Sequence, residues 1–264
     1  MGCGVLQAFG VSDRGRVRPT NEDCYAIDEG LGLLVVADGM GGHNAGEVAA
    51  RMAVDAVVSF LRRGRHWSAA DTWPYGFDPS LSEAGNLVRS AIHAANAGVL
   101  EASMRTPEYF GMGTTLVIAL LDGQRLAVGH VGDSRLYVAR GHELTALTQD
   151  DSWVVSMLKA DPSLDPAALR HHPMRNALTN VIGGGSGAAA HVTDVQLKTG
   201  DLVVLTTDGV HGSLTPEEMA EPMAGGVDLA DLPARLVHEA LEKGSLDNCT
   251  AIVARYEAPP TMLA

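Results

Sequence analysis

Cysteine is scarce in this sequence and does not occur in close pairs. The chain of 264 residues contains only Cys3, Cys24 and Cys249. No CxxC pair is present that could hold zinc, and three scattered cysteines give no even framework for disulfide bonds. This pattern is typical of proteins in a reducing compartment, and we therefore expect a cytoplasmic protein.

Long apolar runs and an excess of basic residues are also missing. No run approaches the roughly 18 residues needed to span a bilayer, and the N-terminus MGCGVLQAFG lacks the basic start and apolar centre of a signal peptide. The chain has 19 Lys and Arg but 32 Asp and Glu, a formal net charge of -13. This negative charge repels nucleic acids and acidic membranes, and we expect neither as a partner.

The hydrophobic content is high enough for a substantial core. Hydrophobic residues make up 46% of the chain, and no repeat or low-complexity segment divides it, so we expect one domain over residues 1–264. Short runs rich in Val, Leu and Ile predict strands at 5–11, 33–37, 114–121, 125–131, 135–139, 202–206 and 250–256. Tight turns at 121–124 and 139–143 indicate antiparallel neighbours.

Helices are expected in blocks separate from the strands. Apolar residues recur at helical spacing over about 45–63 and 81–104. Strand clusters with separate helices favour an α+β layered domain. The connection at about 150–187 holds short helical pieces between Pro and Gly and resembles a flap inserted between two strands. A second irregular segment, 62–80, is rich in aromatic residues and is either a packed loop or a docking surface for partners.

Acidic residues stand at the ends of several predicted strands. Asp38 ends the strand in VVADGMGGHNAGE, Asp208 ends the strand in LVVLTTDG, Asp247 and Asn248 precede the last strand, and Asn21-Glu22-Asp23 precede the strand-like CYAI. An unpaired carboxylate is costly at a buried strand end, so a basic side chain, helix-end N–H groups or a metal ion is expected there. Convergent carboxylates without Cys or His suit magnesium or manganese. An acid followed by glycine is also an ordinary turn signal, and spacing alone leaves both interpretations open.

Motifs of other catalytic classes are missing. The Asp38 loop has Met40 and Gly42 where a calcium loop needs ligands, and no Gly-Lys-Ser or Gly-Lys-Thr follows it as in a phosphate-cradling loop. The sequence has no HExxH, no G-x-S-x-G and no cysteine in a phosphate-binding thiolate loop. A nucleophile supplied by a metal is the mechanism that is left.

Eight segments then identify a family resemblance by their order. They are SDRGRVRPTNEDCY, VVADGMGGHNAGEVA, GMGTTLVIAL, VGHVGDSRLYVARG, LTQDDSW, RNALTNVIGG, LVVLTTDGV and SLDNCTAIV. In this order they resemble the metal-dependent protein phosphatases, the type 2C serine/threonine family, in its bacterial single-domain form. The resemblance runs from about Val11 to Tyr256 and implies a four-layer α/β/β/α sandwich, with two antiparallel sheets flanked by helix pairs.

The resemblance also implies a metal site at one end of the sheets. Two manganese or magnesium ions are expected, and a weaker third ion. Asp38 would bridge the first two ions, the Gly39 carbonyl would bind the first, and Asp208 and Asp247 would bind the second. Asp133 would bind the third ion and share it with Asp208.

Other residues match positions around the ions. Glu22 and Asp23 fall on the acidic pair of the first motif, where Glu22 would act mostly through metal-bound water. Arg18 matches the arginine that holds the substrate phosphate, and its planar fork suits two phosphate oxygens. We expect Asn248 and His43 to lie near the ligands without binding the ions.

Three positions bear on what can be carried over from the family. Met40 stands where some members place a His proposed as the acid for the leaving group. Asp151 replaces the His of the usual Asp-His-Ser, so the contribution of that His is not carried over to this chain. Arg135, in the segment GDSR, is expected to brace acidic loops rather than to touch substrate.

The sequence therefore predicts an active phosphatase for phosphoserine and phosphothreonine in proteins. No phosphoenzyme is expected, since a metal-activated water would attack phosphorus. Phosphorylated proteins and a bacterial serine/threonine kinase are the expected partners, and we expect a monomer. Two alternatives are a catalytically silent regulator that binds phosphoproteins and a metal-dependent phosphoesterase for small molecules.

Overall fold

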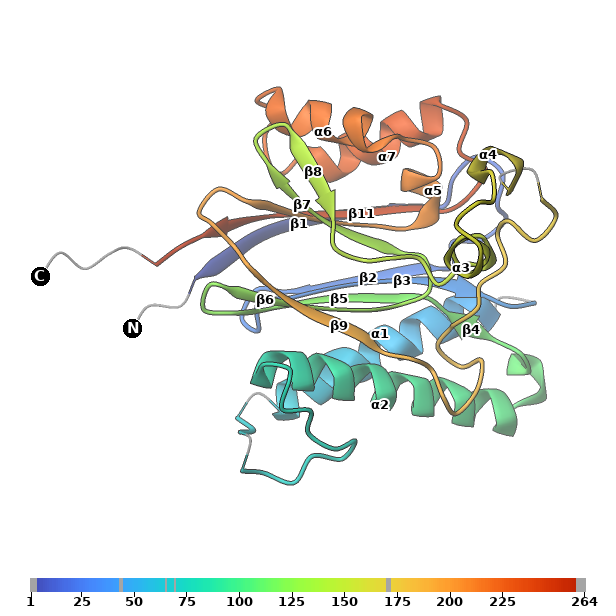
Figure 1. The fold of residues 1–264 in the computed structure, drawn as a ribbon, viewed down its shortest axis with the longest axis vertical. Coiled ribbons are helices and arrows are strands. Elements are labelled where there is room, and N and C mark those ends of the chain that lie inside the picture. The colour runs from blue at the N-terminus through green and yellow to red at the C-terminus, as the bar shows by residue number, and fades with distance from the viewer. Residues whose placement is uncertain (1–3, 43–44, 65, 69, 170–171, 260–264) are drawn as a thin grey trace, which may run out of the picture.

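Two antiparallel sheets lie face to face, and helices cover the outer face of each (Figure 1). The structure is a computed structural model that describes residues 4–42, 45–64, 66–68, 70–169 and 172–259. This arrangement is the α+β sandwich that the sequence predicts. The strands are short and rich in β-branched residues, as expected for sheets that are buried on both faces.

The first sheet brings the beginning and the end of the described chain together. Its strand order is β1-β11-β10-β7-β8. The strands are β1 (Val5–Asp13), β7 (Arg135–Arg140), β8 (Glu143–Ala146), β10 (Leu202–Thr206) and β11 (Cys249–Glu257). β11 pairs with β1 on one side and with β10 on the other, and all residues of β10 are buried.

The second sheet has the order β2-β3-β5-β6-β9, and β4 also pairs with β3. The strands are β2 (Asp23–Asp28), β3 (Leu33–Met40), β4 (Gly113–Thr114), β5 (Leu116–Asp122), β6 (Arg125–Val131) and β9 (His191–Gln196). Hairpins join β5 to β6 and β7 to β8, as predicted. Gly123 (φ 63°) and Gly141 (φ 62°) supply the left-handed backbone that these tight turns need.

Helices α1 (Ala45–Gly64) and α2 (Glu83–Arg105) cover the second sheet, and α6 (Pro216–Ala224) and α7 (Leu232–Glu242) cover the first (Figure 1). The Ser82 side chain caps α2 by accepting from the Gly85 N–H. A capping box of Thr215 and Glu218 begins α6. In the described part of the chain, every helix is too short or too polar to cross a membrane.

Three apolar layers hold the sandwich together, one between the sheets and one under each helix pair. Successive side chains of a strand point to opposite faces of the sheet, so neighbouring residues enter different apolar layers. Val35 faces α1 and α2, whereas Val36 enters the layer between the sheets. Leu205 enters the same middle layer, and Val204 packs under α6 and α7. The four layers α/β/β/α are therefore confirmed.

The structure also corrects the predicted elements at two places. The single strand predicted at 114–121 is divided at Thr115, because the Thr115 N–H donates to the Asp38 carbonyl (2.8 Å) and its Oγ1 accepts from the Asp38 N–H (2.9 Å). Segment 147–190, between β8 and β9, contains the short helices α3 (Trp153–Ala160) and α4 (Pro166–Leu169). The sequence pattern predicts no strand run at β8 or β9, although the predicted turn at 139–143 indicates an antiparallel neighbour for β7.

Candidate metal and phosphate site

Acidic residues from both sheets meet at one end of the sandwich. Asp23 of β2 lies directly opposite Asp38 of β3 in the strand register. In the other sheet, β10 leads into Asp208, the first residue of the short helix α5 (Asp208–His211), and Asp247 comes just before β11. Packing of the two sheets therefore brings together acids that are far apart in the sequence.

Asp23 is fixed by hydroxyl groups of the opposite sheet. Its Oδ2 accepts from Thr207 Oγ1 (2.9 Å) and Thr250 Oγ1 (2.6 Å). Its Oδ1 is buried without a hydrogen-bond partner. Burial, with a smaller contribution from the charges of Asp208 and Asp247, raises the pKa of Asp23 to about 7. One buried carboxylate oxygen is thus available to a cation or to an ordered water.

Asp38 is held through its main chain, which leaves its carboxylate among other acids. Its carbonyl accepts from Thr114 Oγ1 (2.8 Å) as well as from the Thr115 N–H. Thr115 Oγ1 is in turn 2.7 Å from Ser134 Oγ. Burial, followed by the charges of Asp23 and Asp208, raises the pKa of Asp38 well above its ordinary value. The Asp38 carboxylate therefore favours a neighbouring positive charge.

Asp208 and Asp133 share this environment. Asp208 Oδ1 is a second buried carboxylate oxygen without a hydrogen-bond partner. Burial and then the charge of Asp247 raise the pKa of Asp208. Burial and then the charge of Asp208 raise the pKa of Asp133 to about 7. Because the charge of Asp208 contributes to the raised pKa of Asp133, Asp133 lies close enough to the other acids to interact with them electrostatically.

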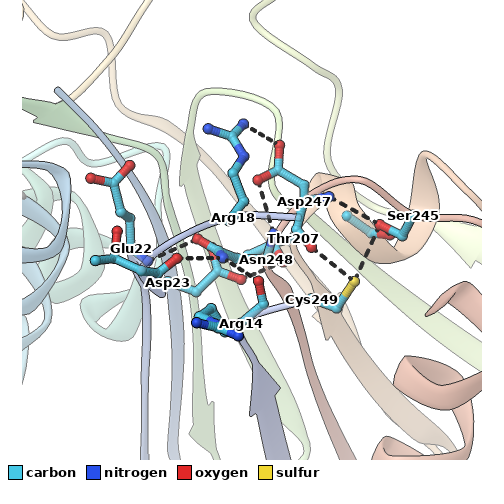
Figure 2. A network of polar contacts seen from close by, with 11 residues as sticks. Arg14, Arg18, Glu22, Asp23, Thr207, Ser245, Asp247, Asn248 and Cys249 are labelled. Atoms are coloured by element: carbon cyan, nitrogen blue, oxygen red, sulfur yellow. Dashed lines mark hydrogen bonds and ion pairs between the residues drawn. The ribbon is translucent and has the colours of Figure 1, made fainter. Parts of the chain in front are cut away.

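Arg18 is the cation that reaches into this acidic group. Its Nη2 donates to Asp247 Oδ2 at 2.6 Å, and Figure 2 shows the two side chains facing each other. The hydrogen bond to Asp247, and more weakly the charges of Asp38 and Glu22, raise the pKa of Arg18. About half of the side chain is exposed (49%), so the guanidinium is accessible to a ligand from solvent.

Asn248 ties the loop that carries Arg18 and Glu22 to the start of β11 (Figure 2). Its Oδ1 accepts from the Glu22 N–H (2.8 Å), and its Nδ2 donates to the carbonyls of Arg14 (2.7 Å) and Thr20 (2.9 Å). Burial, opposed by the charge of Arg18, raises the pKa of Glu22. Asn248 thus positions the first motif beside the last one.

Glycines allow the close backbone approaches at this end of the sheets. A Cβ on Gly39 would lie 2.1 Å from the Gly46 carbonyl oxygen, and a Cβ on Gly209 would lie 1.9 Å from the Asn248 carbonyl oxygen. Both distances are far below any van der Waals contact. The Gly39 N–H also donates to the Glu22 carbonyl (3.1 Å). The glycine after each strand-end acid is therefore required by packing between loops.

The donor set fits a hard divalent cation. Within the described ranges, no group of three or more His, Cys, Asp and Glu side chains is preassembled to hold a metal ion. Magnesium, however, usually binds through one or two carboxylates and keeps several waters. Two buried carboxylate oxygens without partners, on Asp23 and Asp208, and the repulsion around Asp38 are the features that such an ion would relieve.

Most of the predicted site residues lie together. Asp38, Asp208, Asp247, Glu22, Asp23, Arg18 and Asn248 gather around the strand ends, and Asp133 interacts electrostatically with Asp208 and Asp38. His43 lies outside the described residues. Arg135 binds Asp150 through two hydrogen bonds (2.8 and 2.7 Å), which confirms the expected bracing of acidic loops.

The sequence did not indicate the neutral residues that hold the acids. Thr207 and Thr250 bind Asp23, and Thr114 and Thr115 bind the Asp38 backbone. Each of them lies beside an acidic or glycine motif, which is the only signal that the sequence offers. A cavity of about 490 Å³ lies elsewhere, since none of the acids of the candidate site lines it. Leu31, Leu61 and Trp67 are among its lining residues.

Comparison with protein families and curated proteins gives consistent matches. Residues 16–243 match a family model described as Protein phosphatase 2C. The serine/threonine protein phosphatase PstP of Mycobacterium tuberculosis is 33% identical over 250 residues, which cover 95% of this chain but 45% of PstP. The protein phosphatase PhpP of Streptococcus pneumoniae is 33% identical over 260 residues, covering 94% of this chain and 96% of PhpP. The chain thus spans less than half the length of PstP.

Solved structures agree with these matches. A crystal structure of the catalytic domain of PstP in complex with 2 manganese ions is similar with a TM-score of 0.79 and 32% identity. The similarity covers 96% of this chain and 99% of that catalytic domain. The two chains therefore share the arrangement of layers.

Proposed function

Since the chain belongs to the protein phosphatase 2C family, we propose that it is a metal-dependent phosphatase that hydrolyses phosphoserine and phosphothreonine in proteins. One observation carries this proposal: strand-end acids of both sheets converge, and Asp23 and Asp208 each have a buried oxygen without a partner. The manganese ions in the PstP catalytic domain support manganese, or the similar magnesium, as the cofactor.

The acids would hold the cofactor as the family resemblance implies. Asp38, with the Gly39 carbonyl, Asp208 and Asp247, would bind two ions, and Glu22 would act through water. Asp133 and Asp208 would hold a weaker third ion. When bound, such ions supply a Lewis acid for the phosphoryl oxygens and a nucleophilic water at neutral pH.

The residues of the chain supply positioning and charge. Arg18 has five N–H donors in a planar fork, and the contact with Asp247 uses Nη2, so other donors can bind two phosphate oxygens. Asn248 fixes the loop that presents Arg18. Asp38, whose pKa is raised by burial and then by the charges of Asp23 and Asp208, would hold positive charge where the substrate phosphoryl group binds.

We further propose the setting in which this activity operates. Phosphorylated proteins are the substrates, a serine/threonine kinase supplies them, and residues 1–264 act as one catalytic domain, as a monomer, in the cytoplasm. The names of the relatives PstP and PhpP support protein substrates. The connection at about 150–187 is the proposed flap, and its residue Asp151 accepts from the N–H of Gly132, the neighbour of Asp133.

Phosphate release from phosphopeptides tests the function. Peptides with phosphoserine, phosphothreonine or phosphotyrosine are incubated with manganese or with a chelator, using the wild type, Asp38→Asn and the exposed control Asp161→Asn. We expect manganese-dependent release from the first two peptides and a loss of at least ~100-fold in Asp38→Asn, since even residues behind metal ligands contribute about 10–100-fold.

The alternatives predict other outcomes of the same experiment. No release from any peptide by folded, manganese-binding protein would leave the silent phosphoprotein-binding regulator. Faster release from small phosphate esters than from peptides would favour the small-molecule phosphoesterase. Loss of activity in Asp161→Asn as well would show that the assay reports a general effect of removing acidic charge.

A further inference from the structure

Asp151 makes hydrogen bonds to three separate parts of the fold. It lies just before helix α3, at the beginning of segment 147–190. Its Oδ2 accepts from the Gly132 N–H (3.1 Å) and from Asn180 Nδ2 (2.7 Å), and its Oδ1 lies 2.9 Å from His191 Nε2. Its carbonyl accepts from the Thr179 N–H (2.8 Å) and Oγ1 (3.0 Å). The carboxylate is only 14% exposed, so these contacts satisfy a nearly buried charge.

The contact with Gly132 is reciprocal and lies next to Asp133. The Asp151 N–H donates to the Gly132 carbonyl (2.9 Å), while the Asp151 carboxylate accepts from the Gly132 N–H. Gly132 has a left-handed φ of 94°, and a Cβ there would lie 2.8 Å from Thr115 Cγ2. Asp151 therefore fixes both polar groups of the residue that sets the direction of the chain into Asp133.

The contacts with Thr179 and Asn180 lead toward Asp38. Just beyond Asn180, Ile182 forms an isolated bridge with Thr114, and the hydrogen bonds of this bridge measure 3.0 and 2.9 Å. Thr114 Oγ1 in turn donates to the Asp38 carbonyl (2.8 Å). Asp151 thus connects the turn that carries Asp133 with the return of segment 147–190 alongside β4.

His191 attaches the same carboxylate to the edge of the second sheet. His191 is opposite His130 in the register of β6 and β9, and the two rings stack with centroids 5.0 Å apart. His130 Nε2 lies 2.9 Å from the Gln149 carbonyl oxygen. Asp150, the neighbour of Asp151, is bound by Arg135 instead. The beginning of segment 147–190 is therefore anchored to both sheets.

We propose that Asp151 is a positioning residue that locks the two ends of segment 147–190 to the Gly132–Asp133 turn. The inference rests on the proposed function for its catalytic consequence, namely that the lock fixes Asp133 for the weakest of the expected ions. The lock itself is a property of the fold and is tested separately.

The chemistry of the carboxylate explains why an acid serves at this position. Ionised Asp is an acceptor with about four lone-pair positions on two oxygens, whereas a neutral imidazole offers one acceptor nitrogen. Three donors converge on Asp151, from Gly132, Asn180 and His191. A histidine, which the family resemblance leads one to expect here, cannot accept from all three. The His191 ring is thus one of three groups that donate to the Asp151 carboxylate.

Hydrogen exchange tests the lock without any assay of activity. The metal-free wild type is compared with Asp151→Ala, Asp151→Asn and Asp161→Ala, an acid of the same segment whose carboxylate accepts from Ser163. In Asp151→Ala we expect exchange at 130–134 and 177–182 to rise by about tenfold, because the hydrogen bonds from Gly132, Asn180 and His191 to the carboxylate are lost. Asp161→Ala leaves both segments as in the wild type.

The conservative variant Asp151→Asn separates the effect of the hydrogen bonds from the effect of the negative charge. In Asp151→Asn one amide oxygen can still accept from Gly132 and Asn180, so exchange stays within ~3-fold of the wild type. Unchanged exchange at both segments in Asp151→Ala overturns the proposal. So does an increase spread evenly over the chain, which would indicate general destabilisation.

Manganese titration tests the catalytic consequence. Phosphopeptide turnover is measured over a range of manganese concentrations in the same variants. We expect Asp151→Ala to raise the half-maximal manganese concentration by about 10-fold, the effect typical of residues that orient ligands, while kcat at saturating manganese changes little. An unchanged manganese dependence refutes the link to Asp133. An inactive wild type refutes the proposed function, and the exchange result still decides the lock.

Discussion

At the scale of single residues, mutually repelling carboxylates are held by neutral partners. Thr207 and Thr250 donate to Asp23, and Thr114 and Thr115 bind the Asp38 main chain. Hydroxyl groups orient the acids without adding a positive charge that would compete with a cation. The acids therefore keep the raised pKa values that burial and mutual repulsion produce.

Asn248 offers a test of this positioning by neutral groups. Asn248→Ala removes one acceptor and two donors and leaves the Glu22 N–H and the carbonyls of Arg14 and Thr20 without their partner. We expect the free energy of unfolding to fall by about 2–4 kcal/mol, because each net hydrogen bond contributes about 1 kcal/mol and unsatisfied groups cost more. Urea unfolding measures this change.

An exposed asparagine provides the control for that experiment. Asn176 is an exposed residue of segment 147–190. Asn176→Ala should change the free energy of unfolding by less than ~0.5 kcal/mol. Phosphopeptide turnover of folded Asn248→Ala should fall as well, since the loop that carries Arg18 loses its attachment. Stability equal to that of Asn176→Ala would contradict the positioning role.

The acids of the site could be predicted from the sequence, but their partners could not. Asp38 and Asp208 follow apolar runs and precede glycine, a local pattern that sequence displays directly. The threonines that hold Asp23 come from the other sheet, 184 and 227 residues away. Such pairing depends on how the sheets pack, and no periodicity within one segment encodes it.

At the scale of elements, the buried strands and the edge strand β1 were predictable, whereas the edge strands β8 and β9 were not. The runs at 125–131 and 202–206 are mostly or wholly buried and match β6 and β10 at both ends. β8 and β9 lie at sheet edges, and their exposed faces carry polar residues that hide the apolar signal. The capping box of Thr215 and Glu218 is a local sequence signal for the beginning of α6.

Segment 62–80 packs largely through its own aromatic residues. Trp67 makes edge contacts with Phe60 of α1 and with Trp73, and Trp73 in turn contacts Phe77. Trp73 is 6% exposed, and its Nε1 donates to the Ser68 carbonyl (3.0 Å). These contacts favour the packed loop over the docking surface. Figure 1 places the segment below α2, away from the end of β3 that carries Asp38.

Replacement of Trp73 therefore tests whether this segment stabilises the fold or binds partner proteins. We expect Trp73→Ala to lower the free energy of unfolding by about 3–5 kcal/mol, as for other buried aromatic residues, with unchanged turnover of a phosphoprotein per folded molecule. Tyr75→Ala, at a partly exposed position, should change neither. Thermal unfolding and protein-substrate kinetics measure both effects. Slower protein turnover with unchanged peptide turnover would support docking instead.

At the scale of the whole molecule, folding concentrates negative charge where the two sheets meet. Each sheet contributes acids to the same end, and the chain as a whole carries a formal net charge of -13. Assembly of the sandwich and binding of a cation are therefore linked. Anything that neutralises the acids, whether protons or metal ions, stabilises the folded state.

In the metal-free protein this linkage takes the form of a pH dependence. The pKa values of Asp23 and Asp133 are raised to about 7 from the ordinary value of 3.8. Between these values the folded state binds more protons than the unfolded chain, so the free energy of unfolding falls as the pH rises from about 4 to about 7. Burial lowers the pKa of His211 well below 6.5, which acts in the opposite direction. Asp23→Asn isolates the contribution of Asp23.

Manganese should reverse this loss of stability, since a metal ion binds the ionised carboxylates. We expect the rise in Tm on adding manganese to be larger at about pH 8 than at about pH 5.5, because at the lower pH protons compete for the same oxygens. At a free manganese concentration of 100 times the Kd, the free energy of unfolding rises by ~2.7 kcal/mol. Calorimetry with excess manganese or with chelator at both pH values measures the change in Tm. Asp23→Asn in chelator should lose less stability on going to the higher pH than the wild type. A manganese effect that is equal at both pH values would show that the buried acids are not the groups that bind the ion.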